Sequence, residues 1–293
     1  MYHFRIITDS SCDLSISLVQ ELNLQVVPLQ VCLEEKEFQN YPSGSPENSL
    51  DFGEFYDALR HGKMTSTTAA NPEVWRHAME PTLSNGQDVL VLAFSSGLSS
   101  TYAAAELAAK ELREEYPERN IQVVDTLCAS LGQGLLVYHA AKKQQEGLSL
   151  DETAQWVRDN RLHLCHWFTV DDLMFLKRGG RVSAATAVVG TMLNIKPVLH
   201  VDDEGHLIKV ATARGRKASI EALFKSMKQT GLDLEHQDIF ISHGDCLDDA
   251  KYLADMIESA YHPKSIYIDY VGPVIGSHSG PGTLALFFLG SKR

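Results

Sequence analysis

The sequence predicts an α/β protein built from two domains. At 293 residues the chain exceeds the roughly 100–200 residues of a typical single domain. Short apolar runs alternate with stretches whose apolar residues recur at helical spacing, which is typical of a mostly parallel sheet covered by helices. Two strands separated by the short turn "DEG" indicate a hairpin, and hence a mixed sheet, in the second half. We expect an N-terminal α/β domain over residues 1–160, with helices on both faces of a mostly parallel sheet, and a C-terminal α/β domain with a mixed sheet over residues 161–293.

The first half carries a separate signal for each predicted element. The run "FRIITDS" is rich in strand-forming residues and ends in turn residues, and "DVLVLAF" is continuously apolar, as buried parallel strands are. Pro72 is suited to the first turn of a helix, and the alanine-rich stretch that ends at Tyr116 is strongly helical. In order, we expect strands at 4–10, 24–31, 88–94 and 121–126, and helices at 15–24, 50–62, 72–83, 99–116, 131–147 and 149–161.

The second half follows the same alternation. The predicted hairpin joins "KPVLHVD" to "HLIKVATAR", and the apolar stretch "SAATAVVGTMLN" before it is predicted to be a helix packed in the core. In order, we expect strands at 166–170, 196–202, 206–214, 238–244, 265–272 and 283–290, and helices at 171–180, 183–194, 216–231 and 246–261.

Composition and charge exclude several classes of protein. Apolar residues make up 44% and charged residues 22%, which is ordinary for a folded globular chain. The net charge of -12 argues against a nucleic-acid partner, because phosphate backbones require a broad basic surface. Five widely spaced cysteines without metal-ligand spacing are typical of reduced thiols, so we expect a cytoplasmic protein. The N-terminus has no signal-peptide pattern and no apolar run reaches about 18 residues, so we expect no transmembrane segment.

Hydroxyl side chains gather where predicted strands end, which is the edge at which open α/β sheets bind ligands. The segment "SSGLSSTY" follows the strand at 88–94 and opens a helix, whose free N–H groups and positive dipole end favour an anion. The segment "KMTSTTAANPEVW" stands before the helix that begins at Pro72. Capping requires only one or two such hydroxyls. The candidate anion-binding residues in these two segments are Thr65, Ser66, Thr67, Ser95 and Ser96.

A third candidate segment is "GPVIGSHSGPGT", at residues 272–283, which surrounds the single histidine His278 with glycine, proline and serine. The segment offers Ser277, His278 and Ser279, of which we favour Ser277 and His278. Glycine allows a backbone to approach a ligand closely, so the segment could close over an anion held by these two residues. It could equally be a surface loop before the last strand.

Familiar catalytic and cofactor motifs are absent from the sequence. There is no GxxxxGK[ST] or GxGxxG phosphate loop, no GxSxG elbow and no metal-ligand spacing among the twelve histidines. We interpret His166 and His243 as core or strand-end histidines with satisfied hydrogen bonds. Ser95 or Ser96 could be combined with His278 and Asp9 into a hydrolytic triad, but three common residues from separate segments match by chance too easily. Hydroxyls and a helix N-terminus without a base, metal or nucleotide cradle favour binding an anion over transforming it.

The order of several segments resembles the DegV family of bacterial fatty-acid-binding proteins. The matching segments span nearly the whole chain, and they are "ITDSSCDLS", "VVPLQV", "TST", "FSSGLSSTYAAA", "VVDT", "LKRGGRVS", "LNIKPVL", "ARGRKA" and "GPVIGSHSGPGT". The resemblance implies two domains that enclose a long-chain fatty acid of the palmitate or oleate type in the cleft between them. It implies an apolar tunnel for the acyl tail and no other cofactor. It also implies a non-catalytic role, in which the carboxylate is presented to a separate fatty acid kinase that phosphorylates it.

The resemblance also assigns roles to individual residues. The carboxylate-binding serine of the family falls on Ser95 or Ser96, of which we favour Ser96, and the family's histidine falls on His278. The family's threonine falls within residues 65–67, where "TSTTAANP" replaces the usual "TSQP" and leaves the register open by two positions. The usual "LSGTY" also reads "LSSTY" here, with Ser100 in place of glycine. Basic residues of two further motifs are predicted to contact the kinase, and they are Arg181, Arg214 and Arg216.

Two other functions remain open at this point. The chain could be an enzyme that acts on a small acyl or phosphorylated substrate, with Ser96 as nucleophile and His278 as base. It could also be a regulator that senses a lipid through the same pocket. Turnover without a partner would favour the enzyme, and lipid binding without phosphate transfer would favour the regulator.

Overall fold

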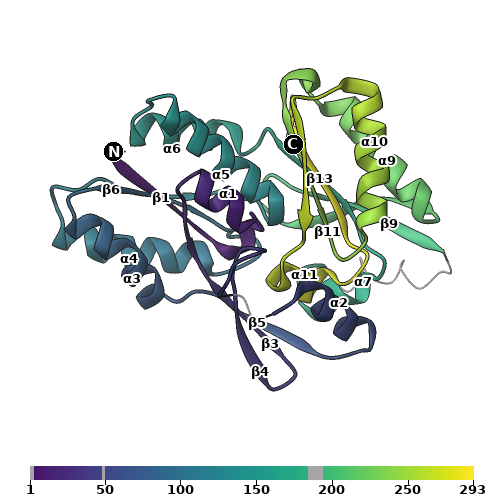
Figure 1. Ribbon diagram of the computed structural model, residues 1–293, viewed down its shortest axis with the longest axis horizontal. Helices are drawn as coiled ribbons and strands as arrows, with labels where there is room; N and C mark the ends of the chain where they lie inside the picture. The colour runs from purple at the N-terminus through teal and green to yellow at the C-terminus, as the bar shows by residue number, and fades with distance from the viewer. Residues whose placement is uncertain (1–2, 48–49, 184–193) are drawn as a thin grey trace.

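The computed structural model describes residues 3–47, 50–183 and 194–293, and it has the predicted α/β architecture (Figure 1). Its first sheet contains four parallel strands in the order β2-β1-β6-β7. The strands are β1 (Phe4–Asp9), β2 (Gln25–Val27), β6 (Asp88–Ala93) and β7 (Ile121–Asp125). All of them precede the predicted domain boundary near residue 160.

Helices cover both faces of this parallel sheet, as predicted. The strand β6 is buried from Val89 to Ala93, and its alternate residues enter two separate apolar clusters. Leu90 and Leu92 pack with α5, whereas Val89 and Val91 pack with α3 and α4. The helices that pack on this sheet are α1 (Ile16–Glu21), α3 (Pro72–Ser84), α4 (Thr101–Glu115), α5 (Ser130–Gln145) and α6 (Leu150–Asn160).

The second sheet is mixed and has six strands in the order β10-β9-β8-β13-β11-β12. Strands β11 and β12 pair in parallel and the other neighbours pair antiparallel, and the predicted hairpin is the β9–β10 pair. Helices α9 and α10 cover one face, and α5 lies against the other. The elements are β8 (Leu164–Thr169), β9 (Ile195–Val201), β10 (Leu207–Arg214), β11 (Asp238–His243), β12 (Ser265–Tyr270), β13 (Leu284–Leu289), α9 (Arg216–Thr230) and α10 (Leu247–Tyr261).

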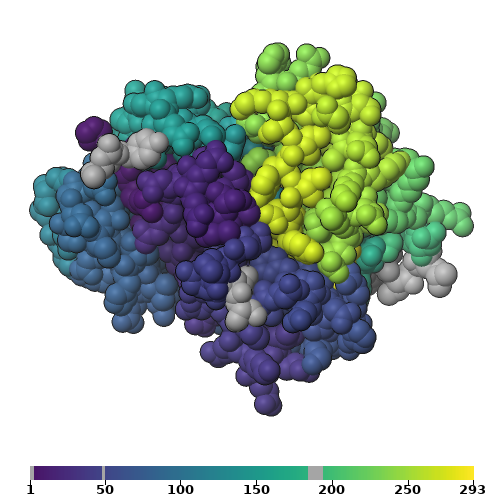
Figure 2. Space-filling model, viewed as in Figure 1, coloured from purple at the N-terminus to yellow at the C-terminus, as the bar shows by residue number. Residues whose placement is uncertain are grey.

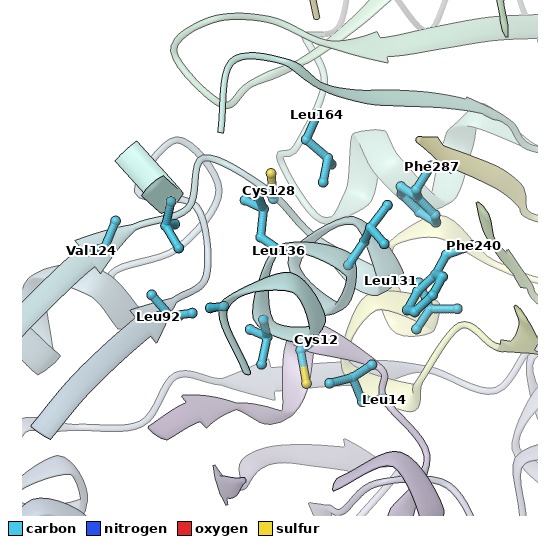
Figure 3. Close-up of a cluster of buried hydrophobic side chains, with 14 of the residues drawn as sticks. Cys12, Leu14, Leu92, Val124, Cys128, Leu131, Leu136, Leu164, Phe240 and Phe287 are labelled. Atoms are coloured by element: carbon cyan, nitrogen blue, oxygen red, sulfur yellow. The ribbon is translucent and has the colours of Figure 1, made fainter. Parts of the chain in front are cut away.

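The two sheets share one apolar cluster through α5, which lies between them. Figure 3 shows Leu131 of α5 facing Phe240 and Phe287 of the second sheet, while Leu92 and Val124 of the first sheet lie across the helix. In Figure 2 the yellow surface of the last strands lies directly against the purple N-terminal segment. A boundary near residue 160 therefore stays a prediction, since the buried side chains on its two sides form one continuous cluster.

A small antiparallel sheet with the order β4-β3-β5 was not predicted, and it supplies one wall of the site. The single strand expected at 24–31 is wrong, because it is divided at Pro28 into β2 and β3, which belong to different sheets. Proline cannot donate a ladder hydrogen bond, so it suits the end of one strand and the start of another. The strands are β3 (Leu29–Leu33), β4 (Lys36–Asn40) and β5 (Thr65–Thr68).

The glycine-rich segment at 272–283 is largely a buried helix, so the surface-loop interpretation is wrong. Helix α11 (Pro273–Ser279) begins at a proline and ends before Gly280, which adopts a positive φ of 79°. It packs against α2 (Phe52–Arg60) and α7 (Leu173–Arg178) and against β3 and β5. The hydroxyl of Tyr56 donates to the carbonyl of Val271, 2.6 Å away, and anchors the start of this segment.

Two remaining sequence expectations concern apolar stretches. Most of the helix predicted at 183–194 lies outside the described residues. Over the residues that the structure describes, none of the helices combines the length and apolarity needed to cross a membrane.

Candidate ligand-binding cavity

A cavity of about 250 Å³ lies where the two large sheets, the small sheet and α11 meet. Most of its wall is apolar, and the side chains come from segments spread over the whole chain. The apolar lining residues are Leu29, Ala69, Phe94, Leu98, Ala129, Phe168, Leu176, Val201, Leu207, Val271, Val274, Ile275, Ala285 and Phe287. The polar ones are Thr67, Ser99, Ser100, Ser130, His166, Arg181, Ser242, His278, Ser279 and Thr283.

Thr67 and His278 form the central polar contact of the cavity. Oγ1 of Thr67 lies 2.8 Å from Nε2 of His278, which joins β5 to α11. The first glycine of the LKRGGR motif makes room for the histidine, because a Cβ on Gly179 would overlap Nδ1 of His278. If Nε2 carries the imidazole proton, it donates to Thr67 and leaves the threonine O–H free to donate to a ligand.

The electrostatics of this region favour an anion. Burial, together with the positive charge of Arg181, lowers the pKa of His278 to about 4, so the imidazole is neutral at pH 7. Burial also lowers the pKa of Arg181, whose guanidinium donates to the carbonyl of Gly179. Within the described ranges, no carboxylate forms an ion pair with Arg181. A half-buried cation without an acidic partner, beside a neutral donor, is a suitable place for a ligand carboxylate.

The phase of α11 decides which serine near His278 faces the cavity. Oγ of Ser277, which was favoured from the sequence, donates to the carbonyl of Pro273 at 2.8 Å, and Ser277 does not line the cavity. Ser279 does line it, and its side chain is only 4% exposed. In the part of the chain that the structure describes, its hydroxyl has no hydrogen-bond partner. Sequence reasoning did not select Ser279, because the phase of a helix cannot be assigned to a stretch interpreted as a loop.

Strand pairing settles which of the three candidates in the TSTT segment can reach a ligand. Side chains of β5 alternate between half-buried and exposed, so Thr65 and Thr67 point to one side and Ser66 to the other. Only Thr67 of these three lines the cavity. The pairing of Thr67 with Val31 and of Thr65 with Leu33 fixes this register.

The first serines of "SSGLSSTY" lie outside the cavity wall. Ser95 is fully buried, and its Oγ donates to the carbonyl of Gly205 in the β9–β10 turn at 3.0 Å. Ser96 is exposed, and its backbone N–H donates to Oδ1 of Asp125. Ser99 and Ser100, at the start of α4, line the cavity in their place. The helix N-terminus predicted from the sequence therefore faces the cavity through the second pair of serines.

The three arginines predicted to contact a partner occupy different environments. Arg181 lines the cavity. Nε of Arg216 lies 2.8 Å from Oδ2 of Asp249, and its Nη1 lies 3.7 Å from Oδ1 of Asp171. Arg214, at the end of β10, is exposed.

The residues considered for a hydrolytic triad are not hydrogen-bonded to one another. Asp9 accepts from the backbone N–H groups of Phe94 and Ser11, and His278 bonds to Thr67. The lowered pKa of His278 also makes it a weak base.

One group of side chains among the described residues is spaced closely enough to hold a metal ion. It consists of Asp202, Glu204 and His206 in the β9–β10 turn. Oδ1 of Asp202 accepts the backbone N–H groups of Glu204 and His206, so the aspartate stabilises the turn.

Comparison with known sequences relates almost the entire chain to one family. The sequence model of the DegV family, described as uncharacterised proteins, matches residues 3–291. A DegV domain-containing protein of Clostridium perfringens is 45% identical over 293 residues, covering 100% of this chain and 99% of the relative. The DegV domain-containing protein YteA of Lactococcus lactis is 35% identical over 290 residues, covering 99% of this chain and 98% of its own.

Comparison with solved structures gives the same result for the fold. A DegV family protein of Thermus thermophilus, described as binding fatty acid, has a TM-score of 0.86 at 32% identity and covers 99% of this chain and 100% of its own. A DegV lipid-binding protein of Thermotoga maritima has a TM-score of 0.85 at 27% identity, covering 99% of each chain. The fatty acid kinase B3 protein of Streptococcus pneumoniae, loaded with linoleic acid, has a TM-score of 0.83 at 21% identity. The match covers 98% of this chain and 99% of that protein, and at this identity it shows a similar fold alone.

Proposed function

The chain belongs to the DegV family, and from this premise we propose that it binds a long-chain fatty acid of the palmitate or oleate type in its cavity. The observation that carries the proposal is the guanidinium of Arg181, which has no acidic partner among the described residues. It lies beside the neutral pair Thr67 and His278 in a mostly apolar cavity. The Thermus and Thermotoga relatives, described as binding fatty acid and lipid, support the same class of ligand.

In this proposal the carboxylate lies at the Thr67–His278 contact. Thr67 and Ser279 donate their hydroxyl hydrogens to it, and Arg181 supplies the positive charge that keeps it ionised in a region of low dielectric. Ser99 and Ser100 at the N-terminus of α4 provide further donors to the same cavity.

The acyl tail contributes most of the binding free energy. Each buried CH₂ contributes about 0.8 kcal/mol, so a tail of about sixteen carbons gives on the order of 10 kcal/mol before ordering costs. The polar residues are too few to supply that amount at about 1 kcal/mol for each hydrogen bond, and they set the orientation of the ligand instead.

We further propose that the protein presents the bound acid to a separate fatty acid kinase and has no catalytic role of its own. The family resemblance of the sequence motifs supports this assignment. Arg214 is the favoured contact for the kinase, because it is exposed whereas Arg181 faces the cavity and Arg216 is paired with Asp249.

The test is mass spectrometry of the purified protein under native and then denaturing conditions, with solvent extraction of the released ligand. We expect one long-chain fatty acid per chain. After delipidation, palmitate should raise the melting temperature, whereas hexadecanol, which lacks the carboxylate, should raise it less. The proposal of fatty-acid binding would be overturned if the protein has the mass of the ligand-free chain and neither palmitate nor oleate raises its melting temperature. Turnover of a small acyl or phosphorylated compound that is lost in Ser96→Ala would then favour the enzyme.

A further inference from the structure

Two helices lie side by side on the outer face of the six-stranded sheet. The helices are α9 and α10, each of 15 residues, and they pack inward on the strands and sideways on each other (Figure 1). The cavity lies on the opposite face of the sheet, because its lining residues Phe168, Ala285 and Phe287 belong to the cluster formed with α5. A molecule bound to α9 and α10 would therefore leave the cavity free.

The side of these helices that faces solvent carries one stripe of residues on each helix. Both stripes have the same spacing i, i+4, i+7, i+8, i+11, which keeps the side chains on one side of a helix. Every member is half-buried or exposed, and a shallow groove of about 380 Å³ lies between the stripes. The members are Lys217, Glu221, Phe224, Lys225 and Lys228 on α9, and Asp248, Tyr252, Asp255, Met256 and Ser259 on α10.

The centre of the two stripes is apolar and aromatic. Phe224, Tyr252 and Met256 line the groove together. Nζ of Lys228 lies 4.7 Å from the centre of the Phe224 ring, and Nζ of Lys217 lies 5.6 Å from that of Tyr252. An apolar centre with charged groups around it is the usual composition of a protein interface.

The two helices carry opposite charges. Helix α9 has four basic residues and one acidic residue, whereas α10 has four acidic residues and one basic residue. The ion pair that joins the helices is Arg216 with Asp249, and both residues lie outside the stripes. In the part of the chain that the structure describes, the lysines and aspartates of the stripes take part in no ion pair, so their charges are available to a partner.

This division of charge makes the helix pair complementary to itself. Two copies related by a two-fold axis present the same surface to each other, so an interface of this kind must be self-complementary. An axis parallel to the helices places each α9 over the α10 of the other copy, with lysine facing aspartate. An axis across the helices would place α9 over α9 and bring like charges together. The charges therefore select the first arrangement.

We propose that two copies of this chain associate through α9 and α10, around such an axis. Phe224, Tyr252 and Met256 form the apolar centre, and the lysines of each α9 face the aspartates of the opposite α10. The net charge of -12 opposes the approach of two copies, but salt screens charges more than about 10 Å apart, so the local pattern decides the contact. This inference is independent of the proposed fatty-acid binding.

The size of the surface sets the expected affinity. A helix of 15 residues is about 22 Å long, and two neighbouring helices together are about 20 Å wide. The two copies therefore cover about 900 Å² in total, which is at the small end of specific interfaces. We expect a reversible dimer with a dissociation constant in the micromolar range.

The test is sedimentation equilibrium of the full chain from about 1 to 300 μM in about 0.1 M salt, where such a dimer forms and dissociates. Two charge variants are measured beside the wild type. The first is Lys217→Glu/Lys225→Glu/Lys228→Glu, and the second is Asp248→Lys/Asp255→Lys. We expect each to weaken self-association by about tenfold or more, because like charges then face each other. The second variant also lowers the net negative charge, so its loss of self-association cannot come from overall repulsion.

An equal mixture of the two variants gives the sharpest result. In a mixed pair every α9 again faces an α10 of opposite charge, so we expect a heterodimer about as tight as the wild-type dimer. Recovery in the mixture also shows that both variants are folded. Lys110→Glu is the matched control, since Lys110 is exposed on α4, away from α9 and α10, and should leave self-association unchanged.

Cross-linking provides a second measurement that needs no variant. A carbodiimide joins amines to carboxylates in contact, and a mixture of isotope-labelled and unlabelled wild-type chains identifies the links between copies. We expect such links between α9 of one copy and α10 of the other. A chain that stays monomeric over the whole concentration range would overturn the proposal. A dimer that both charge variants leave equally tight would overturn it too, because its interface would then lie elsewhere.

Discussion

Nε2 of His278 lies 2.8 Å from Oγ1 of Thr67, although 211 positions separate the two residues in the sequence. This contact joins the small sheet to α11 at the wall of the cavity. Its position beside Arg181 makes it the point at which the proposed function is most directly tested.

Removing the Thr67 hydroxyl should weaken fatty-acid binding. We expect Thr67→Val to lower palmitate affinity about fivefold to tenfold, because one hydrogen bond to a carboxylate is lost while the side-chain shape is kept. Isothermal titration calorimetry on delipidated protein measures this. Thr65→Val is the matched control, since Thr65 lies on the same side of β5 but does not line the cavity. Equal losses in both variants would contradict the assignment.

Removing the Arg181 charge should weaken the binding of fatty acids and leave the binding of fatty alcohols nearly unchanged. We expect Arg181→Gln to lower palmitate affinity by about tenfold or more, since a charge-assisted hydrogen bond is lost, and to leave hexadecanol affinity nearly unchanged. Displacement of a fluorescent probe by each ligand gives the comparison. Arg214→Gln, at an exposed position, should alter neither affinity. A similar loss for the alcohol would mean that Arg181 shapes the cavity without contacting the carboxylate.

Acidification should destabilise the apoprotein through His278. Its pKa falls from the usual value near 6.5 to about 4 on folding, so between these values the unfolded chain binds more protons. The contribution is present in full above about pH 6.5 and is lost as the pH falls toward about 4. The melting temperature of the apoprotein should therefore decrease as the pH is lowered from about 7.5 to about 5.

The His278→Gln variant isolates this contribution from that of His139, whose pKa burial also lowers to about 4. We expect the decrease in melting temperature to be smaller in His278→Gln. It should also be smaller in wild-type protein with palmitate bound, because a nearby carboxylate raises the pKa of the imidazole. An identical decrease in the variant and the wild type would show that His278 does not carry the effect.

Alanine substitutions of the two serines that follow β6 should differ in their effect on protein stability and not in their effect on palmitate binding. Oγ of Ser95 bonds to Gly205, so Ser95→Ala should reduce the free energy of unfolding by about 1–3 kcal/mol. Ser96→Ala, at an exposed position, should change it by less than about 0.5 kcal/mol and leave palmitate affinity unchanged. Urea denaturation and calorimetry measure the two quantities. A large loss of affinity in Ser96→Ala would return the carboxylate to the position favoured by the family motif.

Much of the fold follows from local patterns in the sequence. The continuous apolar run at 88–94 predicts a strand buried on both faces, and β6 is such a strand because helices cover it from both sides. The turn "DEG" between two strand patterns predicts the antiparallel β9–β10 pair. The division of the expected strand at Pro28 could not be predicted from the sequence, because proline is compatible with an edge strand as well as with a break between two strands.

The sequence by itself determined the α/β class and the order of most strands and helices. It also predicts an anion site, because its clustered hydroxyls and one histidine suit an anion. Only the tertiary structure decided which members of each cluster face the cavity. Pairing of β5 with β3 selects Thr67 over Ser66, and the phase of α11 selects Ser279 over Ser277. The turn after α7 places Arg181 beside His278. The physical reason is that residue type and local periodicity are carried by neighbours in the chain, whereas the direction in which a side chain points depends on register and packing against distant segments.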